Sequence, residues 1–225
     1  MTSPRIFLFH ATLVAMEPIR VAMQNLWPEA EAVNILDESL SLDRERQPGA
    51  VSEDITRRFV ALGRQAVAGG ADGILITCSA FGPAIRQLAE EISIPVLMPN
   101  EAMFRAALSL GSRIGMVATF APAIGTMENE FRAFASEAGS AATLETVLAD
   151  GAIESLRRGD AVDHNRRVAE AAAGISGLDA LLLAHFSTSR AADTVRRAVD
   201  IPVLTAPESA VLRMRSMIEG TTQCL

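Results

Sequence analysis

Ala71–Ser79 reads ADGILITCS, and Leu178–Phe186, 107 residues later, reads LDALLLAHF. Both stretches place an aspartate second and follow it with a run of apolar residues. With the same spacing, the sequence IPVL at Ile94–Leu97 occurs again at Ile201–Leu204. A repeat of this length predicts two similar domains that face each other across a cleft.

Within this repeat, Cys78 and His185 occupy equivalent positions, each directly after the apolar run. A cysteine just before the N-terminus of a helix can have a lowered pKa, which makes it a base or a nucleophile. A histidine with an ordinary pKa of about 6.5 can accept and donate a proton at neutral pH. We therefore expect Cys78 and His185 to be catalytic residues on opposite walls of one cleft.

Short apolar runs alternate with longer amphipathic stretches, which is typical of βα units and parallel sheets. We expect strands at Arg5–Phe9, Ala32–Leu36, Gly73–Thr77, Val96–Met98, Ile114–Ala118, Thr143–Leu148, Ala180–Leu183 and Val203–Thr205. We expect helices at Glu17–Leu26, Glu53–Val67, Pro83–Glu91, Ala102–Leu110, Pro122–Glu137, Ala152–Arg158, Asp163–Ala173, Ser189–Val199 and Ser209–Ile218. The predicted fold class is α/β, with a first domain of residues 1–99 plus about 208–225 and a second of residues 100–207.

The composition excludes several classes of protein. The 225 residues, 49% of them hydrophobic, suffice for two small domains, and the net charge of −7 argues against nucleic-acid binding. The apolar run Ile6–Phe9 is too short to cross a membrane and lacks the basic flank of a signal peptide. We therefore expect a cytoplasmic protein with no membrane partner. The two cysteines lack CxxC spacing and no phosphate-binding glycine motif is present, so we expect no metal and no cofactor.

Ligands of open parallel sheets bind at the carboxyl ends of the strands. Four loops at these ends carry hydroxyl groups, backbone N–H groups and aromatic rings, which suit a carboxylate or a developing enolate. The candidate substrate-binding residues in these loops are His10, Thr12, Ser79, Ala80, Thr119, Phe120, Phe186, Ser187 and Thr188.

Two further segments carry polar residues. Residues 37–49 are strongly charged and predict a mobile surface loop, or alternatively a lid over the cleft. His164, the third histidine, is expected on an exposed helix.

The chain resembles the aspartate/glutamate/hydantoin racemase superfamily, and the resemblance is carried by Asp72–Ser79, Gly115–Thr119, Asp179–Thr188 and Ile201–Leu204. It implies a pair of Rossmann-like α/β domains related by pseudo-twofold symmetry, an active site between them and no cofactor. It also implies a homo-oligomer, a dimer or larger. Racemases of this family use two cysteines, one in each half. Cys78 matches the first, and the second falls on His185, so this chain departs from the two-thiol pattern.

Three functions remain open. The first is a cofactor-independent isomerase that moves a proton at the carbon next to a carboxylate or ring carbonyl, on an amino acid or a hydantoin-like substrate, with Cys78 as base and His185 as acid. The second is a decarboxylase of malonate-like acids, which needs only one cysteine as proton donor. The third is a protein that binds a small carboxylate without converting it.

Overall fold

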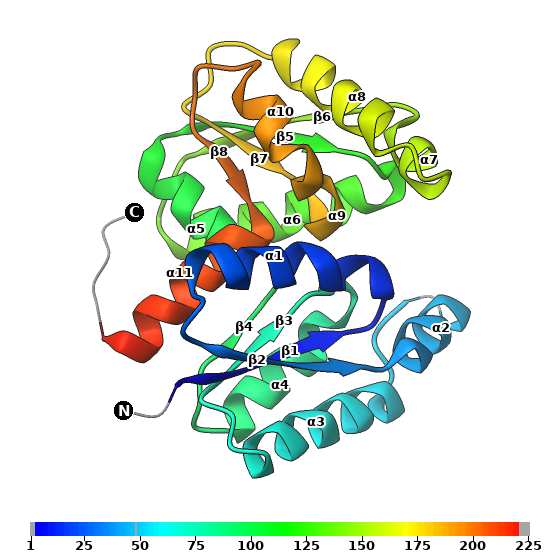
Figure 1. Cartoon of the computed structure of the whole chain (residues 1–225), viewed down its shortest axis with the longest axis vertical. Helices are drawn as coiled ribbons and strands as arrows, with labels where there is room; N and C mark the ends of the chain where they lie inside the picture. Colours follow the sequence, from blue (N-terminus) through cyan, green and yellow to red (C-terminus); the bar gives the residue numbers. More distant parts are fainter. Residues whose placement is uncertain (1–2, 48, 221–225) are drawn as a thin grey trace. The chain divides into compact units, whose positions relative to one another are not determined.

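The computed structural model describes residues 3–47 and 49–220. These residues form two compact units. The first unit holds the residues up to Asn100 together with those from Ala210 onward, and the second holds Glu101–Ser209. Each unit contains a four-stranded parallel sheet with helices on both of its faces (Figure 1). The predicted α/β fold class is confirmed.

The two sheets have equivalent strand orders, β2-β1-β3-β4 and β6-β5-β7-β8. Their strands are β1 (Arg5–His10), β2 (Glu31–Leu36), β3 (Gly73–Ile76), β4 (Val96–Leu97), β5 (Arg113–Ala118), β6 (Thr143–Leu148), β7 (Ala180–Leu183) and β8 (Val203–Thr205). Because β3 corresponds to β7, Cys78 and His185 each lie two residues beyond the third strand of their own unit. The sequence repeat is therefore a repeat of topology.

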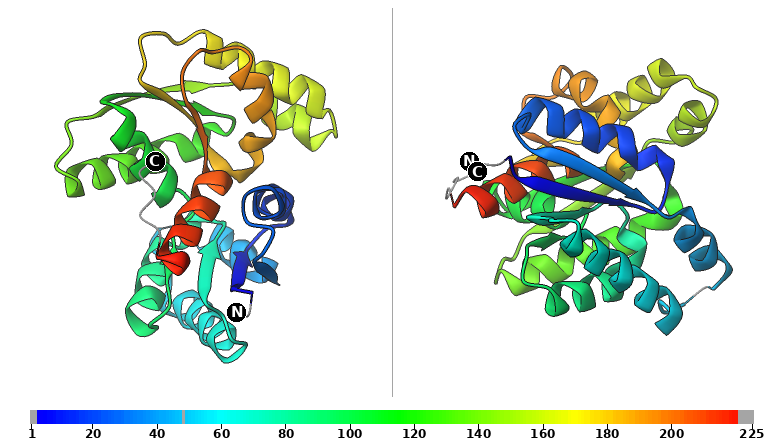
Figure 2. Two further views of the ribbon diagram at one scale, coloured as in Figure 1. Left: turned by 60° about the vertical axis from the view of Figure 1, so that its left-hand side comes forward. Right: turned by 60° about the horizontal axis from the view of Figure 1, so that its bottom comes forward.

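Most helices begin and end within a few residues of the predictions. The predicted helix Ser189–Val199 is divided into a 3-10 helix and a shorter α-helix, and the helices Glu38–Arg46 and His185–Thr188 were not predicted. The α-helices are α1 (Met16–Leu26), α2 (Glu38–Arg46), α3 (Glu53–Ala68), α4 (Gly82–Glu91), α5 (Glu101–Leu110), α6 (Ala121–Glu137), α7 (Ala152–Arg157), α8 (Ala161–Ala173), α9 (His185–Thr188), α10 (Ala192–Arg196) and α11 (Ala206–Glu219). The 3-10 helices are η1 (Leu13–Ala15), η2 (Ser79–Phe81) and η3 (Ser189–Ala191). In the first unit, α1 covers one face of the sheet, and α3 and α4 cover the other (Figures 1 and 2).

The alternation of side chains along the strands builds the core of the first unit. Phe9 of β1 and Ile76 of β3 point to the same face and belong to one buried cluster with residues of α3 and α4. Phe59 of α3 lies at the centre of this cluster, with its ring centroid 6.0 Å from that of Phe9 and 5.6 Å from that of Phe81. Phe81 lies three residues after Cys78 and belongs to this buried cluster, so its ring anchors the loop that follows β3 to the core.

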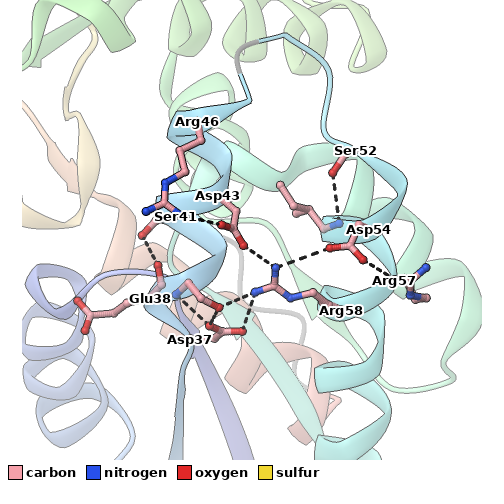
Figure 3. Close-up of polar contacts among 11 residues, drawn as sticks. Asp37, Glu38, Ser41, Asp43, Arg46, Ser52, Asp54, Arg57 and Arg58 are labelled. Carbon is pink, nitrogen blue, oxygen red and sulfur yellow. Dashed lines mark hydrogen bonds and ion pairs between the residues drawn. The ribbon is translucent and has the colours of Figure 1, made fainter.

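Residues 37–49 differ from the prediction of a loop, because Glu38–Arg46 forms the helix α2. Asp37 caps it by accepting a hydrogen bond from the backbone N–H of Ser39. Only Leu40 of this helix is buried, so its sequence carries no apolar stripe. Arg58 of α3 holds it instead, through ion pairs with Asp37 at its N-cap and with Asp43 in its middle (Figure 3).

Among the residues that the structure describes, no helix is both long enough and apolar enough to cross a membrane.

Candidate active site

Cys78 lies just beyond the carboxyl end of β3 and is the N-cap residue of η2. Its thiol is free, and the residue as a whole is half-buried. This is the edge of the sheet where ligands of parallel α/β folds bind. The neighbouring candidates Thr12 and Ser79 are half-buried and Ala80 is exposed, so all three are accessible at this edge.

Burial raises the pKa of the Cys78 thiol, and a hydrogen bond from the backbone N–H of Ala80 partly opposes this effect. The lowering expected from the following helix is therefore wrong. The physical reason is that η2 has only three residues and supplies one donor, whereas protein atoms surround most of the sulfur. The resting thiol is protonated at neutral pH.

A small apolar pocket beside Cys78 also touches His10, Phe59 and Phe81. Its volume of about 10 Å³ holds one water molecule at most. This pocket cannot hold a substrate by itself, and it places the sulfur next to the apolar core.

His10, at the end of β1, is only 3% exposed, and both of its ring nitrogens contact protein groups. Nδ1 lies 3.0 Å from Thr77 Oγ1, and Nε2 lies 2.9 Å from Asn34 Oδ1. Burial lowers the pKa of His10, and the hydrogen bond with Asn34 opposes this. The Thr77 hydroxyl also lies 3.0 Å from the carbonyl oxygen of Phe9, and its single hydrogen can be donated to only one of these two acceptors. In a neutral ring with Nε2–H donating to Asn34, Nδ1 accepts this hydrogen, and the Phe9 carbonyl keeps its hydrogen bond from the Thr77 backbone N–H. His10 thus ties together the ends of β1, β2 and β3, immediately beside Cys78.

Asn34 and Thr77 were not among the candidates from the sequence. Asn34 is a polar residue inside the apolar part of β2, between Val33 and Ile35, and this was the signal that could have identified it. Thr77 directly precedes Cys78.

In the second unit, His185 begins α9 with a φ angle of +69°. Among the described residues, it alone combines a positive φ with a side chain. A non-glycine residue in this region carries strain of about 1–3 kcal/mol, and such strain concentrates at functional sites. The backbone therefore sets His185 apart from every other described residue of the chain.

The His185 ring is half-buried, and its Nδ1 is buried without a hydrogen-bond partner among the described residues. Burial lowers the pKa of His185, and a hydrogen bond with the backbone of Ala184 opposes this. The resting imidazole is therefore neutral.

The other candidates of this unit divide by exposure. Phe120 is 42% exposed and Ser187 is half-buried, so both can reach a ligand. Thr119 and Thr188 are buried with their hydroxyl oxygens 3.3 Å apart, and Phe186 is also buried. In this conformation, Thr119, Thr188 and Phe186 expose at most 4% of their surface.

His164 is fully buried on α8, which contradicts the expectation of an exposed position. Its neighbours at helical spacing, Val168 and Ala172, are buried too, so His164 lies on the apolar stripe of the helix. Among the residues described, no group of three or more His, Cys, Asp or Glu side chains could hold a metal ion.

A model of the Asp/Glu/Hydantoin racemase family matches residues 10–176 of the chain. No curated protein gives a significant match. Solved structures with a similar fold include allantoin racemase from Klebsiella pneumoniae, with 20% identity and a TM-score of 0.74 over 96% of this chain and 88% of that protein. A glutamate racemase isoform from Bacillus anthracis has 15% identity and a TM-score of 0.70, covering 99% and 84%. A mutant of arylmalonate decarboxylase has 20% identity and a TM-score of 0.64, covering 98% and 95%.

Proposed function

Since this chain belongs to the Asp/Glu/hydantoin racemase family, we propose that it is a cofactor-independent isomerase that moves a proton at the carbon next to a carboxylate or ring carbonyl. Its substrate is an amino acid or a hydantoin-like molecule. One observation carries the proposal: Cys78 and His185 follow the corresponding strands, β3 and β7, of two sheets with the same strand order. Each of these side chains can exchange protons.

The resting protonation states suggest which of the two residues acts as the base and which acts as the acid. With burial raising the pKa of Cys78 and lowering that of His185, the thiol holds a proton and the imidazole does not. His185 is then the base that removes the proton from carbon, and Cys78 donates its proton to the same carbon. This reverses the roles expected from the sequence. After one turnover, Cys78 is a thiolate and His185 is an imidazolium. In this form Cys78 is the base and His185 is the acid, so the enzyme catalyses the conversion of the product stereoisomer back into the starting one.

The strand-end loops supply the stabilisation of the substrate anion. Ser79 and Ser187 lie at the carboxyl ends of corresponding strands, β3 and β7, where ligands of parallel sheets bind, and their loops offer backbone N–H groups. We propose that these donors hold the substrate carboxylate and the enolate that forms when the proton leaves.

The test is solvent-deuterium exchange. A panel of amino acids, hydantoins and substituted malonates is incubated with the protein in deuterated water and read by mass spectrometry. We expect deuterium at the carbon next to the carboxylate or ring carbonyl of at least one amino acid or hydantoin, together with conversion into its mirror image. We expect Cys78→Ala to abolish that conversion, because no proton donor then remains on the second face of the carbon. Conversion that is unchanged in Cys78→Ala contradicts the mechanism, and Cys224→Ala is the matched cysteine control.

A second candidate function is decarboxylation of malonate-like acids. It is favoured by the presence of one strand-end cysteine where the family racemases use two, because protonation after carbon dioxide leaves needs one donor. Release of carbon dioxide from substituted malonates, without exchange into amino acids or hydantoins, supports this alternative. Tight binding of a carboxylate with neither exchange nor carbon dioxide release indicates a binding protein.

A further inference from the structure

The helix α2 is attached to the first unit mainly by charge. Arg58 of α3 lies 2.7 Å from Asp43, in the middle of α2, and 3.6 Å from Asp37, its N-cap residue (Figure 3). Arg58 also lies 3.8 Å from Asp54 on its own helix. One arginine therefore links the N-cap and the middle of α2 to α3.

The helix reaches both strand-end loops of its unit. Ser41 donates a hydrogen bond to the backbone carbonyl of Ala11, which follows β1, at 2.8 Å. One turn later, Arg44 Nε donates to the carbonyl of Ala80, in the Cys78 loop, at 3.4 Å. The other two guanidinium nitrogens of Arg44 donate to the carbonyls of Gln47 and Gly49, each at 2.6 Å. All three nitrogens of Arg44 are thus engaged, which fixes the direction of the side chain.

Ala80 is the residue through which this contact can act on the thiol. Its backbone N–H is the donor that stabilises a negative charge on Cys78, against the effect of burial. Its carbonyl is held by Arg44. The other titratable group at the sulfur pocket is His10, whose pKa burial lowers. Asp37, Asp43 and Asp54 pair with Arg58, and the guanidinium of Arg86 lies beside Gly82 at the far end of the loop. The hydrogen bonds of Arg44 go to backbone carbonyls, so it brings a positive charge to the Ala80 carbonyl.

We propose that α2 is a clamp on the strand-end loops and that Arg44 is a positioning residue that sets the reactivity of the Cys78 thiol through Ala80. Without Arg44, the Ala80 backbone is free to turn its N–H away from the sulfur. The inference rests on the proposed function only in that Cys78 performs chemistry, and it is measured without any substrate.

The experiment is alkylation of Cys78 by iodoacetamide as a function of pH, in a Cys224→Ser background where Cys78 is the only thiol. The thiolate is the reactive form, so the midpoint of the rate profile reports its formation. We expect Arg44→Gln to move the midpoint upward and to slow alkylation at pH 8 about threefold, as expected when a charge-assisted contact is loosened rather than a buried group removed. An unchanged or lower midpoint overturns the proposal.

Two variants separate positioning from folding. Arg46 lies on the same helix, and among the described residues its side chain pairs only with Asp43, at 3.5 Å. The control variant is therefore Arg46→Gln. It should keep the parent midpoint, and an upward shift equal to that of Arg44→Gln would overturn the role of Arg44. Arg44→Lys keeps the charge and one donor and should recover part of the alkylation rate. If Arg44→Gln lowers the melting temperature, no recovery in a stably folded Arg44→Lys likewise contradicts the proposal.

Discussion

Thr77→Val tests whether the network around His10 supports the catalytic edge of the first unit. Valine matches threonine in shape and suits a strand end, so the substitution removes little besides the hydroxyl. The hydroxyl lies 3.0 Å from His10 Nδ1, and this nitrogen is buried. Phe9 O, the other partner of the hydroxyl, keeps its bond from the Thr77 backbone N–H. The cost is therefore that of one buried, unpaired ring nitrogen, about 2 kcal/mol.

Urea denaturation measures this loss in the free energy of unfolding. Thr12→Val is the matched control, because Thr12 is half-buried and makes no side-chain cap hydrogen bond, and its effect should stay within about 0.5 kcal/mol. In a His10→Ala background, Thr77→Val should cost less, which gives a coupling of about 1 kcal/mol between the two side chains. Equal costs in both backgrounds, or a Thr77→Val effect no larger than that of the control, would refute the reasoning.

Two further predictions concern stability. Gly63→Ala should cost about 1–3 kcal/mol, because its new Cβ would lie 2.2 Å from Leu88 Cδ1, whereas Gly125→Ala, with nothing within 4 Å inside α6, should stabilise by about 0.5–1 kcal/mol. Urea denaturation decides both, and equal effects contradict the packing described. The pKa of each of the three histidines is lowered in the folded protein. Their contribution to the free energy of unfolding is therefore complete above the pKa of an unfolded histidine, about 6.5. It is lost as the pH falls from there toward the lowered pKa values of the folded protein. The free energy of unfolding should therefore be lower at pH 5.5 than at pH 7.5, and equal values would rule out neutral buried histidines.

The fold was predictable because it is encoded in local patterns. The segments Gly73–Ile76 and Ala180–Leu183 are short, continuous apolar runs, which is typical of parallel strands buried on both faces, and they lie at matching places in the repeat. Sequence order alone then places Cys78 and His185 at the ends of corresponding strands. These features need no knowledge of distant contacts.

The parts that the sequence did not predict depend on contacts between residues far apart in the chain. The helix α2 forms because Arg58, on another helix, pairs with its carboxylates, and no periodicity records this. The direction of the Cys78 pKa depends on burial by residues such as Phe81, whose packing is tertiary. His164 is the exception, since its spacing from Val168 and Ala172 already indicated a buried face.

The central claim is that Cys78 and His185 serve one reaction. On the substrate that exchanges deuterium, kcat/KM is measured for Cys78→Ala, His185→Ala and the double variant, with folding checked by circular dichroism. Residues that act as a unit are strongly non-additive. We predict that the double variant is no slower than the slower single variant. Losses that multiply in the double variant, or a His185→Ala protein with full activity, would contradict the claim.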